Sequence, residues 1–104
     1  MKPHLIHTLN KAVDHRVRLG VMAVLMATET VSFTDLKDIL GLTDGNLASH
    51  VAALEKAEYV AVSKQFVGKK PNTTYAATAA GRAAFEAHLT TLSQLTADYN
   101  GLNG

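Results

Sequence analysis

The sequence has no cysteine and no tryptophan, and only 18% of its 104 residues are charged. Without cysteine the chain can form no disulfide, no thiolate metal site and no cysteine nucleophile. Its longest apolar run, from Leu19 to Ala27, is far too short to span a bilayer, and its first residues lack the apolar core of a signal peptide. We therefore expect a cytoplasmic protein with no membrane partner, and a length that suits one domain over residues 1–104.

Acidic residues are missing from one long stretch of the chain. No aspartate or glutamate occurs over residues 59–85, although three lysines and an arginine lie there. Residues 29–58 are acidic instead, with six carboxylates against two lysines. Such asymmetry can mark a surface for a polyanion. Ordinary scatter of surface charge is the alternative.

Helical spacing of apolar residues alternates with short segments typical of strands and turns. Helices are predicted over residues 4–12, 15–28, 35–40, 44–57 and 79–99, and strands over 31–33, 59–67 and 73–77, with a turn over 68–72. The expected N-caps are Asp14, Thr34, Thr43 and Thr78, and Gly41 is an expected helix stop.

This order of elements predicts a mainly α fold with a small β-hairpin, the winged helix-turn-helix. In this fold two helices joined by a tight turn are followed by a hairpin, whose tip is basic here. The winged-helix core would cover residues 13–78. Additional helices at the N-terminus and over residues 79–99 would serve dimerisation.

The polar face of the helix over 44–57 is the candidate DNA-reading surface, because the second helix of a helix-turn-helix enters the major groove. Leu47, Val51 and Leu54 form its apolar stripe. Asparagine can bond adenine bidentately, serine can bond several bases, and histidine can reach a base or a phosphate. The residues predicted to bind DNA are Thr43, Asp44, Gly45, Asn46, Ser49 and His50. A solvated face of an ordinary amphipathic helix is the alternative.

The hairpin tip, or wing, is the second candidate segment for DNA binding. Its ammonium groups could lie against phosphates or enter a minor groove, whereas a solubilising turn is the alternative. The predicted wing residues are Lys64, Lys69, Lys70, Asn72 and Thr73. For Arg16 and Arg18 the alternatives are a phosphate contact and an ion pair, either with Asp14 or with an acid of the helix over 35–40.

A long apolar stripe on the last helix has no evident partner within the predicted core. Two leucines near the N-terminus pose the same problem. An exposed stripe of this kind would be an association surface, so we expect a homodimer, with folding back onto the chain's own domain as the alternative. The predicted interface residues are Leu5, Leu9, Phe85, Leu89, Leu92, Leu95 and Tyr99.

Several joined motifs resemble small prokaryotic winged-helix regulators related to the MarR family, whose architecture the ArsR-type regulators share. The similarity covers about residues 13–90, through the segments 14–20 (DHRVRLG), 34–50 (TDLKDILGLTDGNLASH), 54–57 (LEKA) and 65–75 (QFVGKKPNTTY), with Thr78, Gly81 and Arg82. The resemblance implies DNA binding, a homodimer and a role in transcription. Within it, residues 44–50 match the recognition helix and residues 66–74 match the wing.

Enzymatic and metal sites find little support in the sequence. Ser49 and His50 are neighbours without a third triad member, and no glycine-rich phosphate loop occurs. His88 and Glu86 stand two residues apart and point to different sides of a helix. We predict no enzyme, no metal and no cofactor.

The favoured hypothesis is a homodimeric transcriptional regulator that binds double-stranded DNA at a pseudo-palindromic operator. The alternative is a winged-helix module that binds protein, which the acidic middle segment and the lack of arginine on the recognition helix favour. The sequence leaves open the operator, repression or activation, a small-molecule effector and the dimer geometry.

Overall fold

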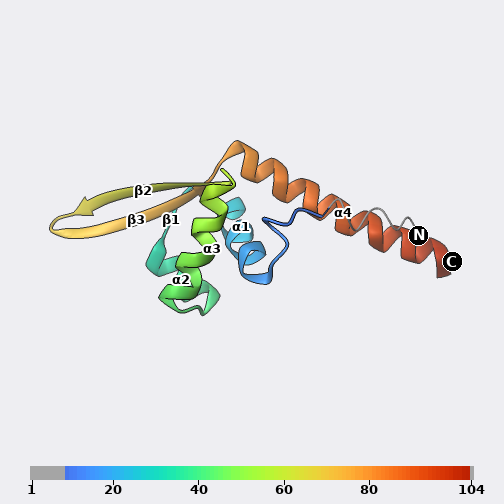
Figure 1. The fold of residues 1–104 in the computed structure, drawn as a ribbon, viewed down its shortest axis with the longest axis horizontal. Coiled ribbons are helices and arrows are strands. Elements are labelled where there is room, and N and C mark those ends of the chain that lie inside the picture. The colour runs from blue at the N-terminus through green and yellow to red at the C-terminus, as the bar shows by residue number, and fades with distance from the viewer. Residues whose placement is uncertain (1–8, 104) are drawn as a thin grey trace.

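The computed structural model describes residues 9–103, with side chains as far as Ala97, and the predicted order of elements from the helix over 15–28 onward is confirmed. Helices and strands form a winged-helix domain in which a long hairpin leaves one end and a long helix leaves the other (Figure 1). The helices are α1 (Arg16–Ala27), α2 (Phe33–Leu40), α3 (Asp44–Lys56) and α4 (Ala79–Asn103), and the strands are β1 (Val31–Ser32), β2 (Val60–Val67) and β3 (Lys70–Ala77).

The three strands form an antiparallel sheet in the order β1-β3-β2. Val67 pairs with Lys70, so the turn has only two residues, and the predicted turn over 68–72 was too long. Gly68 has a φ of 66°, which suits the first central position of a tight type II′ hairpin turn. Pro71 is tolerated in β3 because β1 pairs only with Thr74 and Tyr75, which leaves the other edge of β3 open at the proline.

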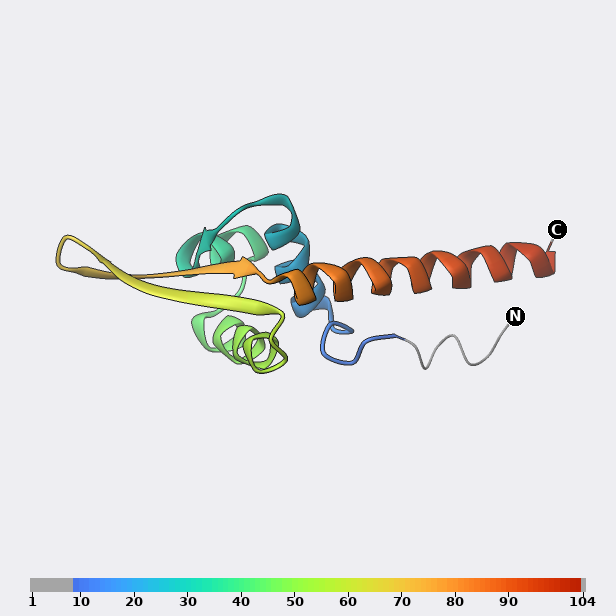
Figure 2. The same ribbon diagram turned by 90° about the horizontal axis from the view of Figure 1, so that it is seen from above.

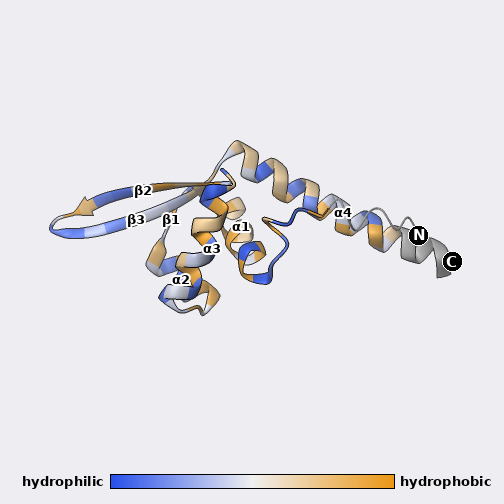
Figure 3. Cartoon of the chain, in the orientation of Figure 1, coloured by the Kyte–Doolittle hydropathy of each residue, from blue (hydrophilic) through white to orange (hydrophobic). Residues whose placement is uncertain are grey.

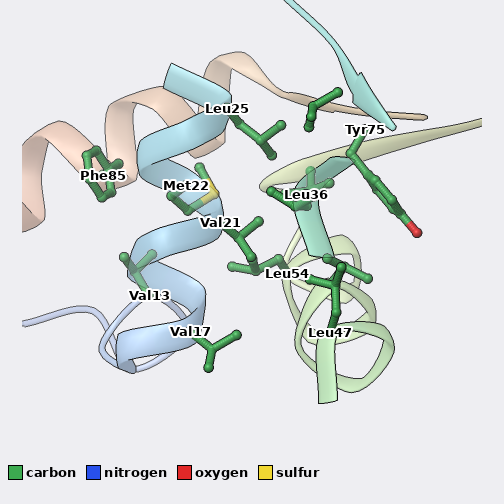
Figure 4. Packing of buried hydrophobic residues seen from close by; sticks show 13 residues of the cluster. Val13, Val17, Val21, Met22, Leu25, Leu36, Leu47, Leu54, Tyr75 and Phe85 are labelled. Atoms are coloured by element: carbon green, nitrogen blue, oxygen red, sulfur yellow. The ribbon is translucent and has the colours of Figure 1, made fainter. Parts of the chain in front are cut away.

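The hydrophobic core lies around α1, which packs against α2, α3, α4 and β3. Side chains of α1 point towards Leu36, Leu47 and Leu54 of the helix-turn-helix, and Phe85 of α4 lies on the other side of α1 (Figure 4). Full burial of an aliphatic side chain of this size stabilises a fold by about 1.5–3 kcal/mol. The helix-turn-helix is therefore held in place by α1.

Three of the predicted helix signals are confirmed. Thr43 caps α3 by accepting from the Asn46 N–H at 3.2 Å, and Thr78 Oγ1 accepts from the Gly81 N–H at 2.9 Å at the start of α4. Gly41 ends α2 in the left-handed region, with φ 65°. A glycine suits this position because it has no Cβ to clash.

Two predicted N-caps were wrong by one or two residues. His15, not Asp14, caps α1 through its Nδ1, which accepts from the Val17 N–H at 3.1 Å. Ser32, not Thr34, caps α2 by accepting from the Asp35 N–H at 3.1 Å. In both cases residues able to cap lie close together, and pairing of β1 with β3 places Ser32 at the entry to α2.

The predicted helix over 4–12 is wrong in its last part, since residues 9–13 form a bend and turn, and residues 4–8 lie outside the described part. Asn10 organises this turn. Its Oδ1 accepts from the Ala12 N–H at 2.9 Å, and its Nδ2 donates to the Tyr59 hydroxyl at 2.8 Å. Its N–H donates to His88 Nδ1 at 3.4 Å. Asparagine side chains compete in this way with helical hydrogen bonding.

The base of α4 is fixed to the rest of the domain by two consecutive residues. A Cβ on Gly81 would collide with the carbonyl oxygen of Tyr59, so only glycine fits there. Arg82 donates to the carbonyls of Leu25 and Met26 at 3.4 and 3.5 Å. Its charge thus lies at the negative end of the α1 dipole.

Beyond this base, α4 projects away from the domain in the direction opposite to the wing (Figure 2). The molecule extends 60 × 25 × 21 Å, with a radius of gyration of 16.0 Å. A compact chain of this length would have a radius of about 13 Å. The outer half of α4 therefore receives little cover from the other described elements.

Candidate nucleic-acid interface

The recognition helix α3 has one buried stripe, and most of its other residues are exposed. Leu47, Val51 and Leu54 are buried against the core, as predicted. On the opposite side the exposed residues are small or polar, which allows close approach of a ligand. These are Gly45, Ala48, Ser49, Ala52 and Lys56.

Asn46 lies on the flank of α3 that faces the start of α1. It is exposed and lines a hollow of about 340 Å³ together with Arg16. The other lining residues are Val17, Leu40, Gly41 and Leu42, so the hollow has an apolar floor with an amide and a guanidinium at its rim. The arrangement brings Arg16 close to the predicted base-reading residues.

His50 lies on the same flank but is already engaged within the chain. Arg18 Nε donates to His50 Nδ1 at 3.1 Å, and Arg18 also donates to the Ala12 carbonyl at 3.3 Å. The ring of His50 stacks on that of His15 with centroids 4.3 Å apart. Arg18 thus bonds a histidine and a backbone carbonyl instead of the acid that the ion-pair alternative expected.

This surrounding lowers the pKa of His50 below its ordinary value of 6.5. Burial has the largest effect, followed by the positive charges of His15 and Arg18. The neutral ring is therefore favoured, with Nδ1 as acceptor and the proton on Nε2. Only the Nε2 edge of His50 is left for a contact with DNA.

Asp44, at the first turn of α3, would repel a phosphate if its charge were free. Lys37 of α2 forms an ion pair with it, with Nζ and Oδ1 3.0 Å apart. The hydrogen bond to Asp44 raises the pKa of Lys37, so the lysine stays charged. The sequence alone does not indicate this pairing, because the two residues lie on different helices.

The register of the hairpin divides the predicted wing residues between its two faces. Lys64 pairs with Thr73, and both alternate in phase with Val62 and Tyr75. Asn72 and Lys70 are out of phase and lie on the other face, and Lys69 is in the turn. Lys64, Lys69 and Lys70 are all exposed, and the two other residues are half-buried.

A groove of about 170 Å³ separates the recognition helix from the wing. Lys64, Glu55 and Tyr75 are among its lining residues. Burial raises the pKa of the Tyr75 hydroxyl, and the negative charge of Glu55 raises it to a smaller extent. Its lining comprises Ala48, Val51, Ala52, Glu55, Val62, Lys64 and Tyr75. Because one face of the wing and one flank of α3 form the two walls of the groove, these elements border a single surface.

The predicted dimer stripe on α4 divides into a buried and an exposed part. Phe85 is buried in the chain's own core, so it has a partner within the chain that the sequence did not indicate. Leu89 and Leu92 are 48% and 39% exposed, and Leu95 is half-buried. Apolar residues recur along α4 beyond the body of the domain (Figure 3). Leu9 is half-buried, and Leu5 and the side chain of Tyr99 lie outside the described residues.

The described residues offer neither a metal cluster nor a membrane-spanning helix. No three histidine, aspartate or glutamate side chains there come together in a way that could hold a metal ion. No described helix combines the length and apolar character needed to cross a membrane. The features that gather on one surface are those of α3 and the wing.

Comparison with known proteins agrees with this geometry. Residues 17–96 match the family model of the winged helix DNA-binding domain. The chain belongs to this family. An uncharacterized protein of Methanocaldococcus jannaschii is 35% identical over 86 residues, which cover 83% of this chain and 94% of that protein.

Solved winged-helix structures resemble the whole chain. A transcriptional regulator homologue from Pyrococcus horikoshii OT3 has 31% identity and a TM-score of 0.75, over 98% of this chain and 99% of its own. The YusO protein of Bacillus subtilis has a TM-score of 0.80 over 97% of this chain and 71% of its own, at 16% identity. The chain is thus a winged-helix DNA-binding domain, and the predicted resemblance to small prokaryotic winged-helix regulators is confirmed.

Proposed function

We propose that this winged-helix protein acts as a homodimeric transcriptional regulator on a pseudo-palindromic operator. The observation that carries the proposal is the shared surface of α3 and the wing, in which exposed small and polar residues of a helix lie beside a lysine-bearing hairpin. An acid-free segment from 59 to 85 supports an anionic partner on the wing side.

Base reading is assigned to the first two turns of α3. Asn46 and Ser49 are exposed there, and Gly45 leaves room for the edge of a base pair. Asparagine pairs best with adenine, and the serine hydroxyl can donate to a base acceptor or accept from a base donor. Thr43 and Asp44 position the helix by its cap and by the ion pair with Lys37, and His50 contributes through its Nε2 edge.

Backbone contacts are assigned to the wing and to the start of α1. Lys69 and Lys70 are exposed at the hairpin turn, and Arg16 borders the hollow beside Asn46. Contacts of this kind fix the register of a protein on DNA without reading its sequence. Lys64, Asn72 and Thr73 extend the contact along both faces of the hairpin.

The dimer is assigned to the outer part of α4. Leu89 and Leu92 are among the few large apolar residues exposed in the described chain, and α4 projects beyond the domain that would otherwise cover them. Pairing with a second copy would bury both stripes in an isologous interface. Two recognition helices held in this way would meet half-sites about one helical turn of DNA apart, roughly 34–36 Å.

Selection of bound sequences from random duplexes tests this function directly. The expected product has two inverted half-sites, and its binding should weaken steeply as salt is added, because phosphate contacts release counterions. A protein-binding module would enrich no sequence and would show little salt-dependent retention on duplex DNA. That outcome would refute the operator model.

A further inference from the structure

The tip of the wing carries the two most exposed large apolar side chains of the described chain. Phe66 is 74% exposed and Val67 is 68% exposed. Phe66 pairs with Pro71 across the hairpin, and directly paired residues lie on the same face of a sheet. Two rigid apolar rings therefore stand side by side at the end of a long projection.

The face on which these rings lie is set by the strand period. Phe66 is two residues from Lys64 and four from Val62, so the three share one face of β2. Val62 and Lys64 line the groove beside α3. Phe66 thus continues the surface that joins the wing to the recognition helix, whereas Val67 points to the opposite face.

The charge around the tip identifies the chemistry of its partner. Lys64 shares the face of the two rings, Lys69 lies in the turn and Lys70 lies on the other face, and neither strand of the hairpin contains an acid. Duplex DNA offers this combination, because its outer surface is anionic and its stacked bases are apolar. A protein partner would need an acidic rim around an apolar socket of the same shape.

The reach of the wing suits the groove next to the one that α3 would occupy. β3 extends five residues from Tyr75, which is buried, to Lys70 at the turn. At about 3.4 Å per residue this is roughly 17 Å. Half a helical repeat of B-DNA, the distance from a major groove to the adjacent minor groove, is also about 17 Å.

We propose that Phe66, supported by Pro71, is a wedge that enters the minor groove beside each half-site and partly unstacks one base step. The DNA would bend towards the major groove, as it does around other proteins that insert an apolar side chain. Steps of pyrimidine followed by purine unstack most easily, so they should be favoured at the contacted position. This inference rests on the proposed DNA-binding function.

The test uses the full chain and the duplex recovered by selection, with 2-aminopurine in turn at each step flanking the half-sites. Binding of the wild type should raise the fluorescence at one step and shorten the distance between dyes on the two ends of the duplex. Phe66→Ala should abolish both signals and weaken binding about tenfold, in line with the loss of one stacking contact. Phe66→Leu, which keeps an apolar wedge, should retain part of both signals.

Val67→Ala is the matched control, because Val67 is nearly as exposed as Phe66 but lies on the other face of the hairpin. It should leave the unstacking and the bend unchanged. A Phe66→Ala variant that binds with the wild-type bend would refute the wedge but leave DNA binding intact. A wild type that binds no duplex would refute the proposed function and the wedge together.

Discussion

Arg18 of α1 donates to His50 of the recognition helix at 3.1 Å, and the acceptor is the imidazole Nδ1. This bond requires Nδ1 to carry no proton, and the stacked ring of His15 adds a second group that disfavours a charge on His50. The position of α3 against α1 therefore depends in part on the protonation state of one histidine.

Acidification should destabilise the protein through His50. Its pKa is lowered in the folded state, so the unfolded chain takes up the proton first as the pH falls. The free energy of unfolding should then decrease as the pH falls through about 6.5, the ordinary histidine value, towards the lower folded value. Denaturant unfolding of the wild type and of His50→Gln at a series of pH values would measure this. If His50→Gln kept the full pH dependence of the wild type, His50 would not be its source.

Removal of base-reading groups should weaken sequence-specific binding more than non-specific binding. Asn46→Ala and Ser49→Ala should each cost about 1–3 kcal/mol on the selected duplex if the residue reads a base. Thr34→Ala, which removes an exposed hydroxyl group from α2, should have no effect. Wild-type affinity and preference in both α3 variants would show that this face of the helix does not enter the groove.

Loss of the wing lysines should change the salt dependence of binding. In the double variant Lys69→Ala, Lys70→Ala, the slope of log K against log salt should fall by about 0.9 for each lost phosphate contact, on every sequence tested. Lys11→Ala, which removes a charge from the exposed turn before α1, serves as the control. An unchanged slope in the double variant would show that the wing tip makes no phosphate contact.

Charge on the exposed stripe of α4 should separate the proposed dimer. Leu89→Glu with Leu92→Glu should give a folded monomer in light scattering, because neither side chain is buried in its own domain. Binding to the two-half-site duplex should fall by orders of magnitude, since the second site is no longer tethered. Ala87→Glu with Gln94→Glu places the same charge on exposed positions of the other side of α4 and should leave both properties unchanged. A wild type that is monomeric at high micromolar concentration would contradict the dimer.

Glycine at position 58 should stabilise the domain. Glu58 follows α3 with a φ of 66°, a left-handed conformation that costs a residue with a Cβ about 1–2 kcal/mol. Glycine also has more freedom in the unfolded chain, which offsets part of this gain. Glu58→Gly should therefore raise the free energy of unfolding by about 1 kcal/mol, as measured by denaturant unfolding. Glu58→Ala removes the same charge but keeps the Cβ, so an equal gain there would assign the effect to charge instead of backbone strain.

The elements that could be predicted are those whose signals are local. Apolar spacing and the caps Thr43 and Thr78 located α3 and α4, and Gly41 located the end of α2. The turn around Asn10 was mistaken for helix because its partners, Tyr59 and His88, are far away in the sequence. Helical spacing gives no information about such partners.

The candidate site was predictable as a set of segments but not as a set of contacts. The exposure of Asn46 and Ser49 follows from the buried stripe of α3, which the apolar period reveals. The engagement of His50 by Arg18 depends on how α1 packs against α3, and no periodicity encodes that packing. Phe66 lies in the segment matched to the wing but was not among the predicted contact residues, because those were chosen for polar or charged groups that can bond DNA.

The contact between Gly81 and the carbonyl of Tyr59 joins the base of the wing to the base of α4 without a side chain between them. The hairpin and α4 are therefore packed directly against each other at this glycine. Since α4 has 25 residues and is about 37 Å long, a small change in the crossing angle of two such helices would be amplified at the wing tips. The spacing of half-sites that the proposed dimer accepts would then be tuned by residues of α4 that never approach the operator.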